Sequence, residues 1–103
     1  MNQKDFERAK FLLYQEKVRK LSEKTFKQDW FENKKNRGKD YELDHRLSIR
    51  DGFENDIPPI IMAHRCNLRV IPKQVNREKS SKSICTYEEL IEEIVESDDP
   101  LID

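Results

Sequence analysis

The segment from Tyr41 to Lys82 constrains the fold more than any other part of the chain. It opens with "YELDHRLSI", which has strand character, followed by a long connection with Gly52 and the pair Pro58-Pro59. Pro58 excludes a central strand here, because proline has no N–H for the hydrogen-bond ladder. "IIMAHRCNLRVI" then returns to the apolar and β-branched residues typical of a strand, and Pro72 suits the start of the helix "PKQVNREKSSK". The predicted order is strand, long loop, strand and short helix, which is a ββα unit.

A long helix is predicted before this unit, over Lys4–Phe26. Apolar residues recur there at helical spacing, with Glu, Lys and Arg between them. We expect this apolar face to pack on the ββα unit, and its main members are Phe6, Leu13, Val18 and Leu21. The positive side chains of the same helix leave a second interpretation open, in which it contacts DNA through Lys10, Lys17, Arg19, Lys20 and Lys24.

A second helix is predicted after the unit, from Thr86 to Ser97. Thr86 followed by Glu89 has the spacing of a capping box, and Pro100 stops further helix. The apolar residues follow helical spacing and predict one buried face, formed by Tyr87, Leu90, Ile91, Ile94 and Val95. Because this helix is acidic, it is also a candidate for binding a protein partner or for competing with DNA.

A length of 103 residues favours one domain of the α+β class. We divide it into a helical segment (1–35), a ββα core (41–83) and an acidic helix with a tail (86–103). Charged residues make up 40% of the chain, so any core is small. Trp30 and Phe31 are expected to cover one edge of that core.

The net charge of −1 hides a basic body with an acidic end. Residues 87–103 carry eight Asp and Glu and no Lys or Arg, so residues 1–86 carry a net charge of +7. A basic body suits a polyanionic partner, because each neutralised phosphate releases counterions. Charge alone is also compatible with an ordinary solvated surface.

Cysteine content and hydropathy predict a cytoplasmic protein. Cys66 and Cys85 are not at CxxC spacing, and reduced thiols are the default for such a pair. The first 30 residues contain no apolar run long enough for a signal peptide or a membrane span, so we expect no membrane association.

Four side chains carry candidate chemistry within the ββα unit. Asp44 and His45 lie on the first strand, Asn67 at the start of the second and Asn76 one turn into the helix. Because that helix packs back on the strands, Asn76 can approach Asp44. A carboxylate and an amide oxygen suit Mg²⁺, and an imidazole can accept a proton from water near pH 7.

These residues also resemble a known family. The stretches "YELDHRLSIRDGFENDIPP", "AHRCNLRVIP" and "NREKSSKS" are similar, in this order, to the HNH (ββα-metal) endonucleases, and in particular to small bacteriophage and intron-encoded enzymes. The similarity covers about residues 36–83. It implies a ββα-metal finger, also called a His-Me finger, with the acidic helix and the N-terminal helix at its sides.

The resemblance implies a role for each of the four side chains. His45 would be the general base, Asp44 and Asn76 would bind one divalent metal ion (Mg²⁺, or Mn²⁺ or another divalent ion), and Asn67 would hold the loop after the first strand so that His45 is positioned. The expected activity is hydrolysis of DNA phosphodiester bonds in the cytoplasm, which is the host cytoplasm if the protein is phage-encoded. One active site cuts one strand, so a monomer would nick DNA, and a double-strand break would need a dimer or sequential nicking.

Two features depart from the family pattern. The third signature residue is Asn76, where many members have His. Asn is usually a weaker metal ligand than His. The chain also lacks the four-cysteine zinc site that stabilises some members, so packing must hold the finger.

Phosphate contacts are expected from basic side chains close to the proposed metal site, although each could simply be solvated. They are Arg46, Lys73, Arg77, Lys79 and Lys82.

Alternative interpretations stay open. Singly, Asp44, His45, Asn67 and Asn76 are more often surface or turn residues. A zinc site formed by His45, His64, Cys66 and Cys85 is disfavoured by the absence of paired ligand spacing. The main rival to an enzyme is a non-catalytic module that binds nucleic acid or protein and keeps the ββα finger only for structure.

Overall fold

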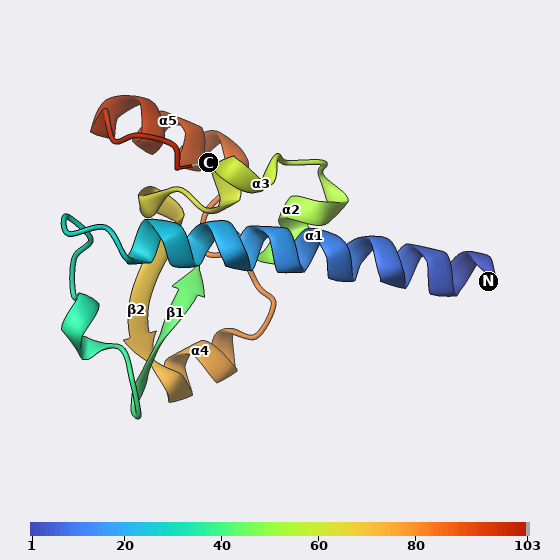
Figure 1. The fold of residues 1–103 in the computed structure, drawn as a ribbon, viewed down its shortest axis with the longest axis horizontal. Coiled ribbons are helices and arrows are strands. Elements are labelled where there is room, and N and C mark those ends of the chain that lie inside the picture. Colours follow the sequence, from blue (N-terminus) through green and yellow to red (C-terminus); the bar gives the residue numbers. More distant parts are fainter. Residues whose placement is uncertain (103) are drawn as a thin grey trace.

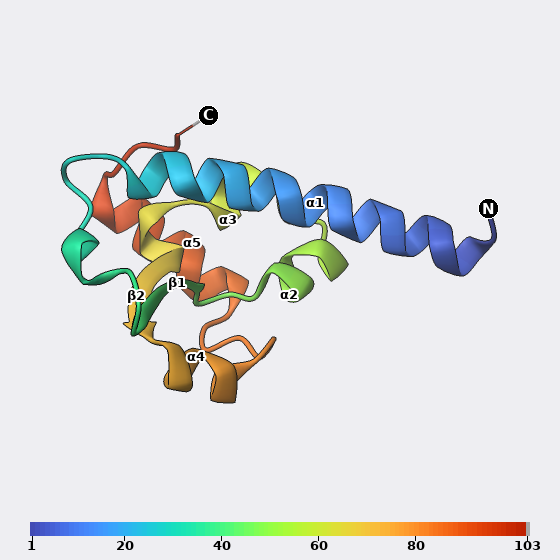
Figure 2. The same ribbon diagram turned by 60° about the horizontal axis from the view of Figure 1, so that its bottom comes forward.

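The computed structural model describes residues 1–102 and shows a small α+β domain (Figure 1 and Figure 2). Five α-helices and a two-stranded antiparallel sheet lie within these residues. The predicted α+β class is confirmed. In chain order the elements are α1 (Gln3–Phe26), β1 (Tyr41–His45), α2 (Ile49–Glu54), α3 (Pro59–Met62), β2 (Leu68–Pro72), α4 (Lys73–Lys79) and α5 (Tyr87–Ser97), with short 3₁₀ turns at Lys34–Asn36 and Arg65–Asn67.

The sheet brings the two predicted strands together. β1 and β2 pair in antiparallel register, with Asp44 opposite Arg69 and His45 opposite Leu68. α4 begins directly after β2 and packs against both strands. Pro72 occupies the N-cap position of α4, where its fixed φ of −56° leads the chain into the helix. α4 therefore lies along the sheet, on the side away from α1 (Figure 2).

The connection between the strands differs from the expectation. The prediction of a long loop is wrong, because residues 49–54 and 59–62 form α2 and α3. Ser48 begins α2 by accepting a hydrogen bond from the N–H of Asp51, and Pro59 stands in the first turn of α3. The second strand is also shorter than predicted, since residues 60–62 are helical and β2 begins only at Leu68.

The helical spacing of apolar residues predicted the position of α1 correctly, but the prediction of which residues are buried was partly wrong. Asn2 caps it through a hydrogen bond from the N–H of Asp5 to the Asn2 side chain. The expectation that Phe6 and Leu13 are buried is wrong, since they are 46% and 68% exposed. The first turns of α1 extend beyond the rest of the domain (Figure 1), which leaves Phe6 exposed. From Phe11 onward α1 contacts the body, first through Phe11 and Tyr14, which pack against Phe53. Leu13 is not among these contacts. The buried residues of the helix are Val18, Ser22 and Thr25.

α5 has the predicted capping box. Thr86 accepts from the N–H of Glu89, and the Glu89 side chain accepts from the N–H of Thr86. Leu90 is fully buried, so docking of the apolar face is confirmed at this position, whereas Val95 is 73% exposed. Two ion pairs add to the docking, Arg46–Glu93 and Arg65–Asp99.

The core lies between the C-terminal half of α1, the segment around α3, and α5. Its buried members are Val18, Leu47, Ile57, Met62, Cys85 and Leu90. Phe31 closes one edge as expected, at 6% exposure, but Trp30 is 40% exposed. None of the helices within residues 1–102 combines the length and the apolar character needed to cross a bilayer.

Candidate functional site

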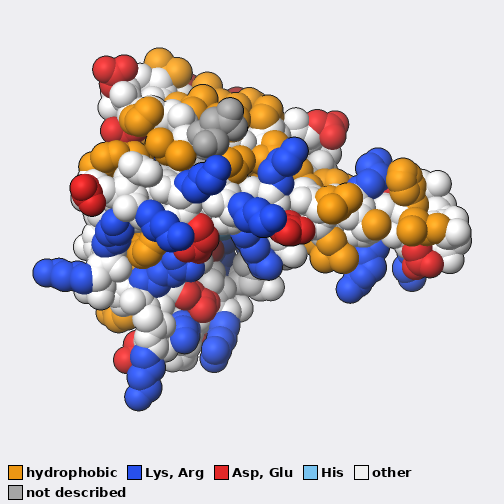
Figure 3. Space-filling model, viewed as in Figure 1, with side chains coloured by type: hydrophobic (Ala, Val, Ile, Leu, Met, Phe, Trp, Pro, Cys, Tyr) orange, Lys and Arg blue, Asp and Glu red, His pale blue; other side chains and the backbone are white. Residues whose placement is uncertain are grey.

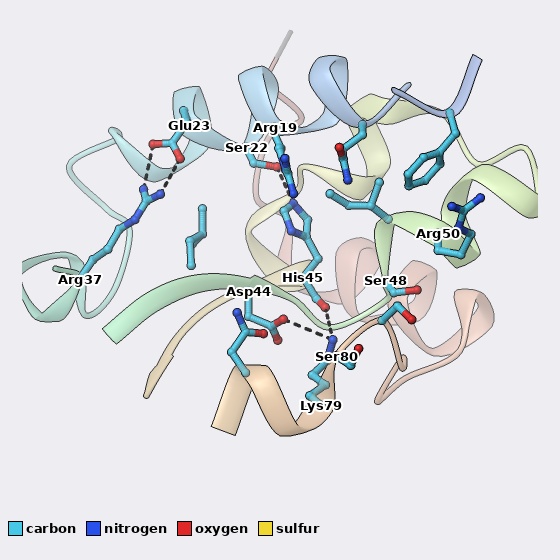
Figure 4. Close-up of a pocket in the computed structure, with 16 residues that line it drawn as sticks. Arg19, Ser22, Glu23, Arg37, Asp44, His45, Ser48, Arg50, Lys79 and Ser80 are labelled. Atoms are coloured by element: carbon cyan, nitrogen blue, oxygen red, sulfur yellow. Dashed lines mark hydrogen bonds and ion pairs between the residues drawn. The ribbon is translucent and has the colours of Figure 1, made fainter. Parts of the chain in front are cut away.

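A cavity of about 520 Å³ lies between α1, β1 and α4, and we call it the central cavity. Figure 4 shows α1 on one side of it and the end of β1 with α4 on the other. The predicted site residues Asp44, His45 and Asn76 all line it. The remaining lining comes mainly from α1 and from the start of α2, and includes Phe11, Gln15, Arg19, Ser22, Glu23, Arg37, Arg50 and Lys79.

His45 reaches from the end of β1 to α1. Its Nε2 lies 2.8 Å from the Oγ of Ser22 (Figure 4), and the same Oγ donates to the carbonyl of Val18 at 2.7 Å. A hydroxyl has one proton, so the arrangement that satisfies both contacts has the Nε2–H of His45 donating to Ser22. The lone pair of the neutral imidazole is then on Nδ1. No group within residues 1–102 forms a hydrogen bond with Nδ1.

The surroundings of His45 keep it neutral. Burial lowers the pKa of His45 to about 4, against the opposing effect of the Asp44 carboxylate. The positive charges of Arg19 and Lys79 lower this pKa further. At neutral pH the imidazole is therefore uncharged, and Nδ1 is available to accept a proton.

Asp44 points to the opposite side of β1, toward α4. Its carboxylate is buried, with Oδ2 2.8 Å from the Nε of Arg69 and Oδ1 3.3 Å from the Nζ of Lys79. Lys79 Nζ also donates to the carbonyl of His45 at 3.0 Å (Figure 4). The Asp44 carboxylate and the His45 carbonyl, both at the end of β1, therefore bind the Lys79 ammonium group at the central cavity.

Asn76 is held next to the same strand. Its Nδ2 donates to Glu42 Oε1 at 2.6 Å, and its Oδ1 makes no hydrogen bond within residues 1–102. Glu42 and Asp44 are two residues apart on β1, so their side chains share the face toward α4. The neighbouring Val75 is 46% exposed, so Asn76, and not Val75, faces the strand.

Hard oxygen donors lie on this side of β1. Asp44 and Asn76 line the central cavity, whereas Glu42 does not line it and binds Asn76. The two oxygens of Asp44 are bound to Arg69 and Lys79. Mg²⁺ in proteins is typically held by one or two carboxylates and keeps several waters or phosphate oxygens as its remaining ligands.

Asn67 fixes the segment that follows β1. Its side chain is fully buried, its Oδ1 accepts from the N–H of Leu47 at 2.7 Å, and its Nδ2 donates to the carbonyls of Leu47 and Met62. The N–H of Arg46 also donates to the backbone carbonyl of Asn67. Asn67 therefore ties the chain just after His45 and does not line the central cavity.

The five basic residues expected at phosphate lie in different surroundings. Arg46 binds Glu93 of α5 and the carbonyl of Cys66. Lys79 is not solvated, because its side chain is 7% exposed and bound to Asp44. Lys73 is half-buried, while Arg77 and Lys82 are exposed, and none of these three lines the central cavity.

Three residues that contact the predicted site residues were not predicted, and of these only Ser22 lines the central cavity. Arg69 could have been found, because it lies directly opposite Asp44 once the strands are paired. Glu42 could have been found from its i, i+2 relation to Asp44. Ser22 carries no local signal, since its contact with His45 depends on how α1 crosses the sheet.

The zinc interpretation has no support in the geometry. His64 Nδ1 accepts from the N–H of Cys66, and His64 Nε2 lies 3.1 Å from the carbonyl of Asp99. Cys85 is buried in the core. Across residues 1–102, no three His, Cys, Asp or Glu side chains gather into a metal-binding cluster.

Comparison of the chain with protein-family models, curated proteins and solved structures finds no match.

Proposed function

We propose that this protein is a metal-dependent DNA endonuclease of the HNH (ββα-metal) type. One observation carries the proposal: His45, Asp44 and Asn76, which the sequence pattern singles out, line a single cavity. The antiparallel pairing of β1 with β2, and the packing of α4 on both strands, supports the expected ββα-metal finger.

In this proposal His45 is the general base. Ser22 accepts the Nε2–H and so holds the imidazole with its basic Nδ1 unpaired. An imidazole with a pKa of about 4 is a weak base. A nearby phosphodiester anion favours the protonated form, so substrate binding raises the pKa of His45 toward the range in which general bases work best.

Asp44 and Asn76 would hold the divalent metal ion, with Glu42 as a further oxygen donor from the same strand face. When bound, the ion supplies positive charge for the phosphoryl oxygens and the leaving 3′ oxygen. Arg69 and Lys79 orient the Asp44 carboxylate by binding one oxygen each. Asn67 holds the chain after His45, so it acts as a positioning residue.

The direct test is incubation of supercoiled plasmid with Mg²⁺, Mn²⁺ or EDTA. We expect open circles to appear first with a divalent ion and no product in EDTA, because one active site cuts one strand. Alanine in place of His45 should abolish cleavage while the protein still binds DNA. A wild-type protein that binds DNA but does not cut it with either metal would identify a non-catalytic module, and a His45→Ala variant that cuts at the normal rate would remove His45 as the base.

A further inference from the structure

Four positively charged side chains line the central cavity, and their partners divide them into two groups. Arg37 binds Glu23 through two parallel hydrogen bonds, Nη1–Oε1 at 2.8 Å and Nη2–Oε2 at 2.7 Å. Lys79 binds Asp44. Arg19 and Arg50 have no carboxylate within ion-pair distance among residues 1–102. Two of the four charges are thus neutralised within the protein, and two are not.

Arg19 lacks a carboxylate partner among residues 1–102 because Glu23 on α1 binds Arg37 instead. Glu23 lies four residues further along α1, where it could pair with Arg19 across one helical turn. Both Glu23 oxygens are instead occupied by Arg37, which holds the pKa of Glu23 below its ordinary value. Arg19 also lies one turn before Ser22, the residue that binds His45, so it shares the face of α1 that looks onto the imidazole (Figure 4).

Arg50 is held in place by an aromatic ring instead of an acid. Its guanidinium carbon lies 3.7 Å from the centre of the Phe11 ring, and Phe11 packs edge-to-face against Phe53. Such stacking fixes the plane of a guanidinium and leaves its N–H groups free to bind a ligand. Arg50 is therefore an ordered positive group at the rim of the cavity.

We infer that Arg19 and Arg50 bind the phosphates of the DNA strand on either side of the scissile bond, so that α1 and the start of α2 form the second wall of the DNA groove. This inference rests on the proposed function. Both guanidiniums are exposed and line the cavity that contains His45. Arginine matches the geometry of a phosphate with two parallel hydrogen bonds. Figure 3 shows Lys and Arg side chains gathered over the C-terminal half of α1 and the region around α4, which gives the remaining duplex a positive surface.

The structure separates this role from general positive charge. Lys20, next to Arg19 on α1, is bound to Glu16 and does not line the central cavity. The variants Arg19→Gln and Lys20→Gln each remove one positive charge from the same turn. The Arg19 charge faces the cavity and has no carboxylate partner among residues 1–102, whereas the Lys20 charge lies outside the cavity and is paired with Glu16.

The experiment measures binding of a fluorescent DNA duplex across a salt series in EDTA, where no cleavage occurs. We expect Arg19→Gln and Arg50→Gln each to weaken binding about tenfold and to reduce the slope of log Kd against log salt by about one, because each loses a phosphate contact. Lys20→Gln should keep the wild-type slope. Arg50→Lys, which retains the charge, should keep most of the slope, and circular dichroism confirms that each variant is folded.

The outcomes distinguish this inference from the proposed function. If Arg19→Gln and Lys20→Gln change the slope equally while the wild-type protein cuts plasmid, the inference is wrong and the nuclease stands. If the wild-type protein binds the duplex with the expected arginine effects and never cuts, the nuclease is wrong and the phosphate contacts stand. A wild-type protein that does not bind the duplex overturns both.

Discussion

The imidazole Nε2 of His45 lies 2.8 Å from the hydroxyl of Ser22, which is 23 residues earlier in the chain and in a different element. Because the Ser22 hydroxyl donates its only hydrogen bond to the carbonyl of Val18, it can only accept a hydrogen bond from His45. The contact therefore decides which ring nitrogen carries the proton, and so which one can act as a base.

Replacing Ser22 with Ala should slow DNA cleavage about tenfold to a hundredfold, the usual cost of losing a group that orients a site residue. DNA affinity should stay at its wild-type value. Thr25→Val is a matched control, since Thr25 is buried on the same helix and donates to the carbonyl of Leu21 without touching His45. ¹⁵N NMR of the imidazole should show Nε2–H in the wild-type protein and a mixture of tautomers in Ser22→Ala. A purely Nδ1–H ring in the wild type would contradict the assignment.

Removing the Asn76 side chain should raise the metal concentration needed for half-maximal cleavage by at least about tenfold, because losing an outer partner of a metal site already costs that much. Gln74→Ala is the control, as Gln74 is an exposed residue of α4 whose side chain hydrogen-bonds to Glu78 and does not line the central cavity. A titration with Mg²⁺ and Mn²⁺ measures the shift. Equal titration curves for Asn76→Ala and the wild type would take Asn76 out of the ligand set.

Asn67→Ala should destabilise the protein by about 3 kcal/mol, since it leaves buried backbone groups of Leu47 and Met62 without partners. Asn55→Ala, at an exposed position, should cost about 0.5 kcal/mol or less. Urea unfolding compares the two. A small cost for Asn67→Ala would mean that the segment after β1 is held by other contacts.

The low pKa of His45 makes stability depend on pH. Burial lowers that pKa to about 4 from an ordinary value of 6.5, so the unfolded chain takes up a proton at a higher pH than the folded one. The stabilising contribution is present above pH 6.5 and is lost as the pH falls toward 4. Between pH 7 and 4.5, the free energy of unfolding of the wild type should fall by about 2 kcal/mol more than that of His45→Gln. Parallel curves for the two proteins would show that His45 is not protected from protonation.

The sequence predicts the elements that carry their own start and stop signals. α5 was predictable from its capping box and α1 from its helical spacing. α2 and α3 were missed because Gly52 and the Pro58-Pro59 pair indicate a loop, yet the six-residue helix α2 contains Gly52 and the four-residue helix α3 begins at Pro59. The Ser48 cap was the local signal that could have found α2.

The candidate site was predictable on the strand side and not on the helix side. Asp44, His45 and Asn76 lie in one ββα pattern, so their closeness follows from strand order and helix position. Arg19 and Ser22 reach the cavity only because of the angle at which α1 crosses the sheet. That angle depends on packing across the whole core, so it cannot be predicted from any short stretch of the sequence.

The N-terminal part of α1 projects from the domain and sets a fixed distance and direction from the cavity. Gln3 and Ser22 belong to one continuous helix, which at 1.5 Å per residue separates them by about 30 Å. Any module joined ahead of α1 would be held at a fixed distance and direction from His45 instead of swinging on a tether. Inserting one residue into the exposed half would rotate that module by about 100°, whereas inserting seven would restore its orientation about two turns further away. If the protein is the nuclease proposed above, a DNA-binding module fused to the free end of this helix would direct cleavage to the DNA that the module binds.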